Sequence, residues 1–324
     1  MAVPRSYLVI VAVVVAGFAA MPPASNYWQL LITQIGMFGL LAIAFDICLG
    51  FAGMLSLATA LFYGLGAYGF AYALKALGLD VICGAVVAVA FAMVAALLTG
   101  SLAVRLKGPS FLIMSLLLVT AVHAIAQNWK GITGGDDGLV LDPQLFRALG
   151  HAFVPIDRYY FGLALFAIGF FSTAALVASP LGRLMRSVKE NDFRAEMLGY
   201  SARAIKLAAF TWAAGLAGLA GAGYAAAFQH VHTGLLHWTV SAEALMFGFF
   251  GGIGTLVGPV VGAAIVLPFE DFMSSKVGYP RLFTGILLVV MVLVHRDGVL
   301  GLVKAVVARV TRRGGKTPPD EVEP

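Results

Sequence analysis

Four polar residues stand inside long apolar stretches of the chain and carry groups that can bind a ligand or form hydrogen bonds. Asp46 lies in LAIAFDICLGFAG and Glu243 in VSAEALMFG, while Ser56 and Thr59 lie in GFAGMLSLATALFYGLGAY. Ionisable side chains are expensive in apolar surroundings, so each one is a candidate functional group. We expect Asp46 and Glu243 to bond to backbone or hydroxyl donors on neighbouring helices. Two interpretations stay open: a polar lock that joins helices, or a position on a path for a solute.

The sequence carries no motif typical of an enzyme. It contains no GxxxxGK[ST], HExxH or GxSxG pattern. His230, His232 and His237 cluster and suggest zinc, but nothing in the sequence supplies a fourth ligand, so ordinary interfacial histidines are favoured. Cys48 and Cys83 lie in separate apolar runs and predict neither a disulfide nor a metal site. We therefore expect no catalytic residue, metal or cofactor in this chain, and any ATP and Mg to be bound by other subunits.

The composition indicates an all-α polytopic integral membrane protein. The 324 residues are 60% hydrophobic and only 11% charged, with a mean hydropathy of +0.93, whereas soluble domains carry about 25% charged residues. The 38 glycines suit helices that pack closely in lipid. The pI of about 9.2 is explained by basic loops on one side of a membrane, so nucleic acid is not an expected partner.

The apolar runs predict about ten membrane crossings, since about 20 residues are needed to span. They cover residues 6–21, 27–49, 54–76, 81–104, 109–129, 158–178, 206–229, 240–256, 257–274 and 281–295. The eighth and ninth runs are interrupted by glycines and a proline, which predicts broken or re-entrant helices that are buried in protein or line a cavity. The small residues between Gly50 and Tyr68 allow either a further break or a tight helix crossing.

A polar segment, Ser179–Lys206, separates the two apolar halves and holds six of the basic residues. Its basic character predicts a cytoplasmic location. Pro180 and Gly199 suit the start and end of a short helix lying on the inner face of the membrane. This helix has an apolar side that needs a partner, formed by Ala195, Met197 and Leu198.

The positions of Lys and Arg predict the orientation of the chain. Counting crossings outward from the polar segment leaves both termini inside, with 15 basic residues inside and 6 outside, out of 21. The first apolar run is short enough for a signal peptide, but the count favours a retained span. We thus expect a transmembrane domain over residues 1–308, an external loop at 130–157, a cytoplasmic loop at 179–206, and a disordered cytoplasmic tail at 309–324.

Five segments, in order, resemble the LivM-type permease subunit of branched-chain amino-acid ABC importers. They span about residues 46 to 266. They read LGFAGMLSLATALFYGLGAY, RLKGPSFLIMSLLL, NWKGITGGDDGL, SPLGRLMRSVKENDFRAEMLGYSARAIKLAAFTWAAGLAGLAGAGYA and SAEALMFGFFGGIGTLVGPVVGAA. One glycine-rich motif would be weak evidence, but five in the family's order are specific. The resemblance implies a bacterial inner-membrane protein that translocates a small solute.

The same resemblance implies partners and a docking site. The implied partners are a homologous second permease, two cytoplasmic ATPase subunits and a periplasmic solute-binding protein. Residues 179–206 match the family's coupling loop. The residues implied to dock on an ATPase are Glu190, Asn191, Asp192, Arg194, Ala195, Glu196, Leu198 and Gly199.

The chain departs from the family at two places near the second span. Asp46 stands where relatives commonly have Asn, and Ala58-Thr59 stand where they often have Gly-His. These departures leave the solute open, because similar permeases serve urea, short amides and aromatic acids as well as branched-chain amino acids. A stand-alone secondary carrier is the weaker alternative. Asp46 and Glu243 could supply the intramembrane charge that such a carrier needs, but a carrier has no need for a docking helix.

Overall fold

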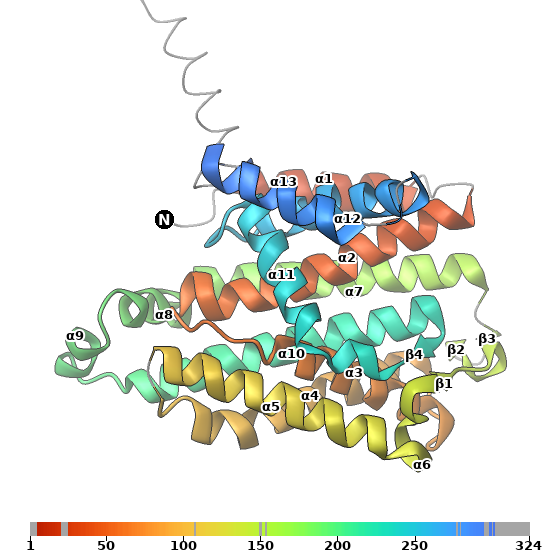
Figure 1. Cartoon of the computed structure of the whole chain (residues 1–324), viewed down its shortest axis with the longest axis horizontal. Coiled ribbons are helices and arrows are strands. Elements are labelled where there is room, and N and C mark those ends of the chain that lie inside the picture. The colour runs from red at the N-terminus through yellow and green to blue at the C-terminus, as the bar shows by residue number, and fades with distance from the viewer. Residues whose placement is uncertain are drawn as a thin grey trace, which may run out of the picture.

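The computed structural model describes residues 5–20, 25–106, 108–148, 151–152, 154–276, 278, 280–294, 298–299 and 301. Within this part of the chain, ten helices of 14 to 27 residues form a bundle, and most of them run along its long axis (Figure 1). They are α1 (Arg5–Ala20), α2 (Asn26–Asp46), α3 (Thr59–Lys75), α4 (Val81–Ala103), α5 (Pro109–Asn128), α7 (Pro155–Ala178), α10 (Ala202–Phe228), α11 (Trp238–Gly251), α12 (Gly258–Lys276) and α13 (Pro280–Val294).

Five of these segments are long and apolar enough to cross a membrane on length and composition alone. They are 26–51, α4, α5, residues 156–178 of α7, and α10. The remaining helices are shorter, or, in α12, carry Pro268 in the interior of the helix and acidic residues in its second half. The structure therefore confirms a polytopic helical membrane protein, with the predicted interruptions concentrated around α11 and α12.

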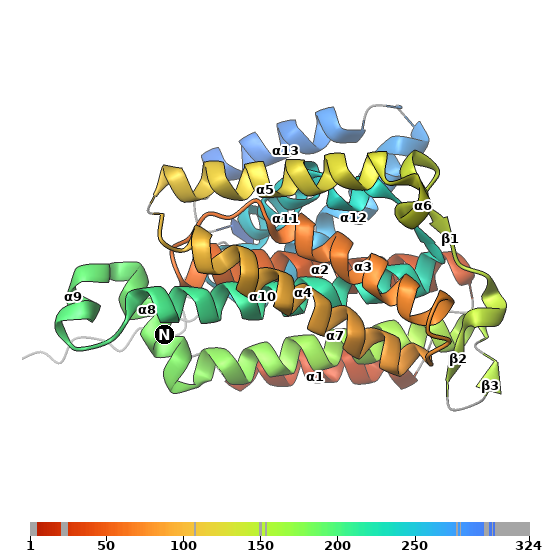
Figure 2. The same cartoon turned by 90° about the horizontal axis from the view of Figure 1, so that it is seen from below.

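The core of the bundle is the glycine- and alanine-rich helix α10, which packs against α2, α3, α4 and α7. Figure 2 shows α5 and α13 along one edge of the bundle and α1 and α7 along the other. Small residues permit the close contacts: a Cβ at Gly66 on α3 would overlap the backbone of Gly218 on α10. Such close approach is how helices associate in lipid, where no hydrophobic force drives them together.

The polar segment at 179–206 and the loop at 130–157 lie at opposite ends of the bundle (Figure 1). One end carries α8 (Pro180–Glu190) and α9 (Asp192–Met197). The other carries α6 (Lys130–Thr133), the 3-10 helices η2 (Gly135–Asp137), η3 (Pro143–Leu145) and η4 (Thr233–Leu236), and four two-residue strands: β1 (Leu139–Val140), β2 (Arg147–Ala148), β3 (His151–Ala152) and β4 (His230–Val231). β1 pairs antiparallel with β4, and β2 with β3.

The third crossing begins at Thr59, five residues later than the predicted start at 54. Helix α2 instead continues as a π-helix, η1 (Ile47–Phe51), and residues 52–58 are not helical. Gly53 has a φ of +70°, a left-handed conformation that favours glycine and ends the helix. The structure contains both predicted alternatives for the Gly50–Tyr68 stretch: a break at residues 52–58, and a tight helix crossing where Gly66 meets Gly218.

The eighth and ninth crossings are separated by a second irregular segment, residues 252–257. α11 ends at Gly251 rather than at the predicted 256, because Gly252 and Gly254 adopt φ values of +113° and +77°. These conformations are accessible to glycine and stop the helix.

The prediction of one surface helix in the polar segment is wrong. The segment forms two helices, α8 and α9, which are separated at Asn191. Asn191 has extended φ and ψ of −162° and 107°, and its side-chain oxygen accepts a hydrogen bond from the Arg194 amide at 3.0 Å. This N-cap competes with a continuous helix and starts α9 instead. The disordered tail predicted at 309–324 lies outside the described residues.

Candidate functional site

The first break, residues 52–58, is held by a serine from a helix far away in the sequence. The Ser241 hydroxyl on α11 donates to the Leu57 carbonyl oxygen at 2.6 Å and accepts from the Ala60 amide at 2.8 Å. It also accepts from the Thr59 hydroxyl at 2.9 Å. One donor and two acceptors are all that a hydroxyl offers, so Ser241 is fully used as a lock between α11 and the start of α3.

A second serine holds the same break from α5. The Ser115 hydroxyl accepts from the Leu57 amide at 2.9 Å and donates to the Leu112 carbonyl oxygen at 2.7 Å. Ser56 stays local, because its hydroxyl accepts from the Ala58 amide at 3.2 Å. The irregular backbone is thus hydrogen-bonded inside protein, as non-helical backbone at membrane depth requires.

Asp46 joins the end of α2 to the second break. Its side chain is 2% exposed, and its Oδ1 accepts a hydrogen bond from the Gly254 amide at 2.7 Å. Its other oxygen, Oδ2, has no hydrogen-bond partner among the described residues. A Cβ on Gly50 would overlap both the Asp46 carboxylate and the Gly254 amide. The second break therefore meets η1 at Gly50, next to the start of the first break.

The surface helix α8 is attached to this meeting point. The Lys189 ammonium donates to the Gly50 carbonyl oxygen at 2.6 Å, and the Lys189 stem packs on Gly53. One turn earlier, the Arg186 guanidinium lies 5.2 Å from the centre of the Phe51 ring, a cation–π contact. Two basic side chains of α8 thus contact η1 and the start of the first break.

The residues implied to dock on an ATPase fall into two groups. Ala195 is buried, and Asp192 forms an ion pair at 2.5 Å with Lys206 at the start of α10. The exposed members are Glu190, Asn191, Arg194, Glu196, Leu198 and Gly199. α9 and the residue after it also present three large apolar side chains to the outside: Phe193, Met197 and Leu198, which are 69%, 74% and 71% exposed.

Glu243 does not join Asp46 but lies in the first half of α11, half-buried. It is close enough to the buried Tyr63 hydroxyl to interact with it electrostatically. Tyr63 belongs to a cluster of aromatic rings from four helices, whose centroids lie 5.9 to 6.4 Å apart; the rings are Phe38, Tyr63, Tyr224 and Phe247. Glu243 thus lies beside a cluster of aromatic rings, two residues along α11 from Ser241.

Four of the histidines lie in two pairs. The His230 and His232 rings stack at 5.6 Å, while His237 lies 5.0 Å from His123, which the sequence analysis overlooked. Burial, and then the positive charge of neighbouring His230, lower the pKa of His232 below its ordinary value. Within the described residues, no three His, Cys, Asp or Glu side chains are grouped so that they could hold a metal ion.

Sequence reasoning missed four residues that organise this site. Ser115 and Ser241 are single serines in apolar runs, and neither has a local signal that distinguishes it from a serine bonded to its own helix. Lys189 was counted only among the six basic residues of the polar segment. Its neighbours in the sequence give no sign that it bonds to Gly50, 139 residues away. Phe193 was visible as an aromatic residue within a polar segment, which is a recognisable sign of an interaction surface.

The structure combines apolar helices, two irregular segments (residues 52–58 and 252–257) and the amphipathic helices α8 and α9 at one end. Together these features define a polytopic membrane protein with the discontinuous helices of transport proteins. Residues 27–295 match the family described as "Branched-chain amino acid transport system / permease component". The chain belongs to this family, as the five motifs in the sequence predicted.

Individual relatives agree with the family assignment. The chain is 28% identical over 288 residues to the high-affinity branched-chain amino acid transport system permease protein LivM of Escherichia coli K12, covering 82% of this chain and 68% of the relative. LivM of Salmonella typhimurium is 28% identical over 295 residues, covering 84% and 69%. LivH of Escherichia coli K12 is 24% identical over 288 residues, covering 83% and 93%. No solved structure matches the chain.

Proposed function

We propose that this protein is the membrane-spanning permease subunit of an ATP-binding-cassette importer for branched-chain amino acids in a bacterial inner membrane. A periplasmic binding protein delivers the solute, and separate cytoplasmic subunits bind and hydrolyse ATP with Mg. The family match over residues 27–295 carries this proposal. The similarity to both LivM and LivH supports pairing with a second, homologous permease.

The ATPase contacts the α8–α9 end of the bundle, which lies on the cytoplasmic side with both termini. Phe193, Met197 and Leu198 form an apolar surface there that is too exposed to contribute to the core of this chain. Aromatic and methionine side chains surrounded by charged residues are typical of binding surfaces. Around them, exposed Glu190, Asn191, Arg194, Glu196 and Gly199 form a polar rim.

Movement of the docked ATPase reaches the membrane interior through α8. Lys189 and Arg186 attach α8 to η1, so a displacement of α8 pulls on the backbone around Gly50. Gly50 lies against Asp46, whose carboxylate holds the Gly254 amide. A rigid helix that acts on a bistable irregular segment is a recognised way to convert docking into a change of access.

The solute passes along the surface where this chain meets the second permease, and the two breaks control access to it. Ser241 and Thr59 lock the first break, and Asp46 locks the second. Irregular backbone in transport proteins is found where it meets solute or a cavity. Asp46 and Thr59 therefore act in this proposal as structural locks beside the path, while Ser56 shapes the first break through its local bond to Ala58, and Glu243 lies by Tyr63.

Reconstitution tests the docking surface. The chain is assembled with the second permease, both ATPase subunits and the binding protein in proteoliposomes, and ATP hydrolysis and radiolabelled leucine uptake are measured. Phe193→Ser removes the central apolar side chain of the docking surface, and hot-spot residues of this kind contribute about 2 kcal/mol or more to binding. We expect the ATPase subunits to dissociate on purification and uptake to fall more than tenfold.

The matched control is Leu77→Ser, an exposed apolar residue that lies between α3 and α4, at the opposite end of the bundle from α8 and α9. It is expected to keep both the ATPase subunits and uptake. Normal uptake by Phe193→Ser would disprove docking at α9. A wild-type complex that moves leucine without ATP, or that holds no ATPase, would instead disprove the importer assignment itself.

A further inference from the structure

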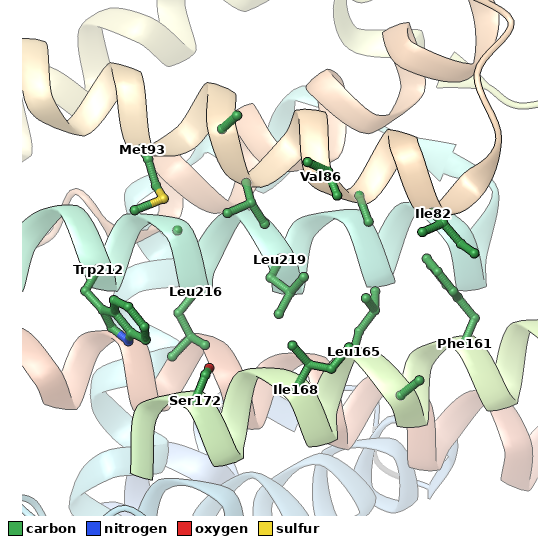
Figure 3. A pocket seen from close by; sticks show the side chains of 15 residues that line it. Ile82, Val86, Met93, Phe161, Leu165, Ile168, Ser172, Trp212, Leu216 and Leu219 are labelled. Carbon is green, nitrogen blue, oxygen red and sulfur yellow. The ribbon is translucent and has the colours of Figure 1, made fainter. Parts of the chain in front are cut away.

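An apolar groove of about 650 Å³ lies on the bundle between α4, α7 and α10. Figure 3 shows Val86 of α4, Ile168 of α7 and Leu219 of α10 pointing into it from its walls. All three helices are among the segments long and apolar enough to cross a membrane. Val86 and Ile168 are 65% and 60% exposed. The groove therefore opens toward the hydrocarbon of the bilayer rather than toward water.

The walls offer no polar group to an occupant. Only Ser172 and Trp212, among the lining side chains, carry a hydroxyl or an N–H group. The Ser172 hydroxyl donates to the Gly169 carbonyl oxygen at 3.1 Å, and the Trp212 indole N–H donates to the Thr173 hydroxyl at 3.3 Å. Because both groups are used within the protein, the groove suits a purely apolar chain.

The length of the groove matches one leaflet. It runs from Ile82 to Met93 along α4 and from Phe161 to Ser172 along α7, which is about 16 Å at the rise of an α-helix. The hydrocarbon core of a bilayer is about 30 Å thick. Ile82 is the second residue of α4, so the groove begins near the end of α4 that lies toward the 130–157 loop and ends near the middle of that helix, at Met93.

A basic side chain lies at the loop end of the groove. Arg158 is on α7, one turn before Phe161, so the two side chains share a face of that helix. Its guanidinium lies 6.0 Å from the Phe146 ring centre, and its buried Nε has no hydrogen-bond partner among the described residues. A guanidinium beside the headgroup level is well suited to binding a phosphate.

We propose that this groove binds one acyl chain of a phospholipid from the leaflet on the side of the 130–157 loop, with the lipid phosphate at Arg158. The apolar walls, the one-leaflet length and the single positive charge at the mouth all fit one phospholipid molecule. The lipid covers the contacts between α4, α7 and α10, and so belongs to the folded permease. This site depends only on membrane insertion, not on the solute that the importer carries.

Photocrosslinking tests the proposal on the purified complex. The complex is placed in nanodiscs of phosphatidylethanolamine and phosphatidylglycerol, with a small fraction of phosphatidylethanolamine carrying a diazirine in one acyl chain. Labelled residues are then located by mass spectrometry. We expect stronger labelling of Met93, Leu216 and Leu219 in the groove than of Leu98, which is 69% exposed on α4 outside the groove.

Two variants separate a bound lipid from general contact with the bilayer. Ala164→Phe fills the groove and is expected to abolish labelling of Leu216 and Leu219. The matched control, Ala175→Phe, enlarges an exposed alanine on the same face of α7 beyond the groove and should leave labelling unchanged. Arg158→Gln should lower labelling in the groove without changing that of Leu98.

Two results would overturn the proposal. The first is groove labelling that is no stronger than that of Leu98 and that is the same in Ala164→Phe as in the wild-type protein, which would mean that only bulk lipid touches this face. Groove residues protected from lipid and crosslinked to the second permease would mean that a helix of that subunit fills the groove.

Discussion

The Lys189 ammonium lies 2.6 Å from the carbonyl oxygen of Gly50, although 139 residues separate the two in the sequence. This hydrogen bond connects the surface helix α8 to the last turn of the π-helix η1. Carbonyl oxygens at the end of a helix lack partners within it, and a cation there is favourable. The bond therefore satisfies a free backbone group and links the proposed docking surface to the interior.

Lys189→Met is expected to weaken coupling without unfolding the protein. Methionine keeps the apolar stem on Gly53 but removes the charged donor, and a hydrogen bond of this kind contributes about 1 kcal/mol. ATP hydrolysis should continue while leucine uptake per ATP falls several-fold. Lys189→Arg keeps a donor and is expected to recover part of the loss. Arg183→Met, at an exposed position of the same helix, is the control. An unchanged uptake-to-hydrolysis ratio in Lys189→Met would remove Lys189 from the coupling route.

Asp46→Asn distinguishes a polar lock from a charge on the solute path. Asparagine keeps an oxygen that can accept from the Gly254 amide, so we expect near-normal thermal stability and uptake. Asp46→Leu leaves the Gly254 amide buried without its acceptor, which costs about 1 to 3 kcal/mol. Its unfolding midpoint in detergent should fall. If Asp46→Asn unfolds normally but loses uptake, the charge itself is required and the lock interpretation fails.

Gly50→Ala is expected to be strongly destabilising. The added Cβ would overlap the Asp46 carboxylate and the Gly254 amide, where η1 meets the second break. Overpacking of this kind costs about 1 to 3 kcal/mol. Gly17→Ala in α1 is the control, since nothing lies within 4 Å of its new Cβ. Heating can be followed with a thiol-reactive dye on buried Cys48, after exposed Cys83 is replaced by serine. Equal midpoints for both variants would show that the breaks are not tightly packed.

Acidification is expected to destabilise the loop end of the bundle through His232. Burial, and then the charge of His230, hold the pKa of folded His232 below the ordinary value of 6.5. The unfolded chain therefore binds more protons, and stability rises with pH in this range. The contribution of His232 to stability is fully present above about pH 6.5, and it is lost as the pH falls through the lower pKa that His232 has in the folded protein.

Thermal unfolding between pH 7.5 and pH 5.5, followed by intrinsic fluorescence, measures this effect. His232→Gln should flatten the pH dependence of the midpoint, because the titrating group is gone. A variant that keeps the wild-type slope would assign the acid sensitivity to another group.

Much of the fold follows from the sequence for a direct physical reason. A chain that crosses lipid must satisfy its backbone within each segment, so long apolar runs without charges become helices. The runs at 81–104 and 109–129 accordingly match α4 and α5 to within a residue. The glycines at 252 and 254 likewise predicted the second break, because glycine readily adopts the left-handed conformations that stop a helix.

The boundaries of the broken segments could not be predicted in the same way. The helix expected from residue 54 starts at Thr59 because Ser115 and Ser241 offer an alternative to helical hydrogen bonds for residues 57–60. The single helix expected in the polar segment divides at Asn191, where a side-chain cap competes with the backbone. Both outcomes depend on a few hydrogen bonds, each contributing about 1 kcal/mol.

The sequence by itself determined the class of protein, the family and the polar segment, because composition, apolar length and motif order are properties of the chain alone. Only the tertiary structure decided how the candidate residues are used. Ser241 meets Leu57 across 184 residues, and Gly254 meets Asp46 across 208. No local pattern records such pairs, since each hydroxyl or carboxylate finds its partner only when the helices pack and exclude every other donor and acceptor.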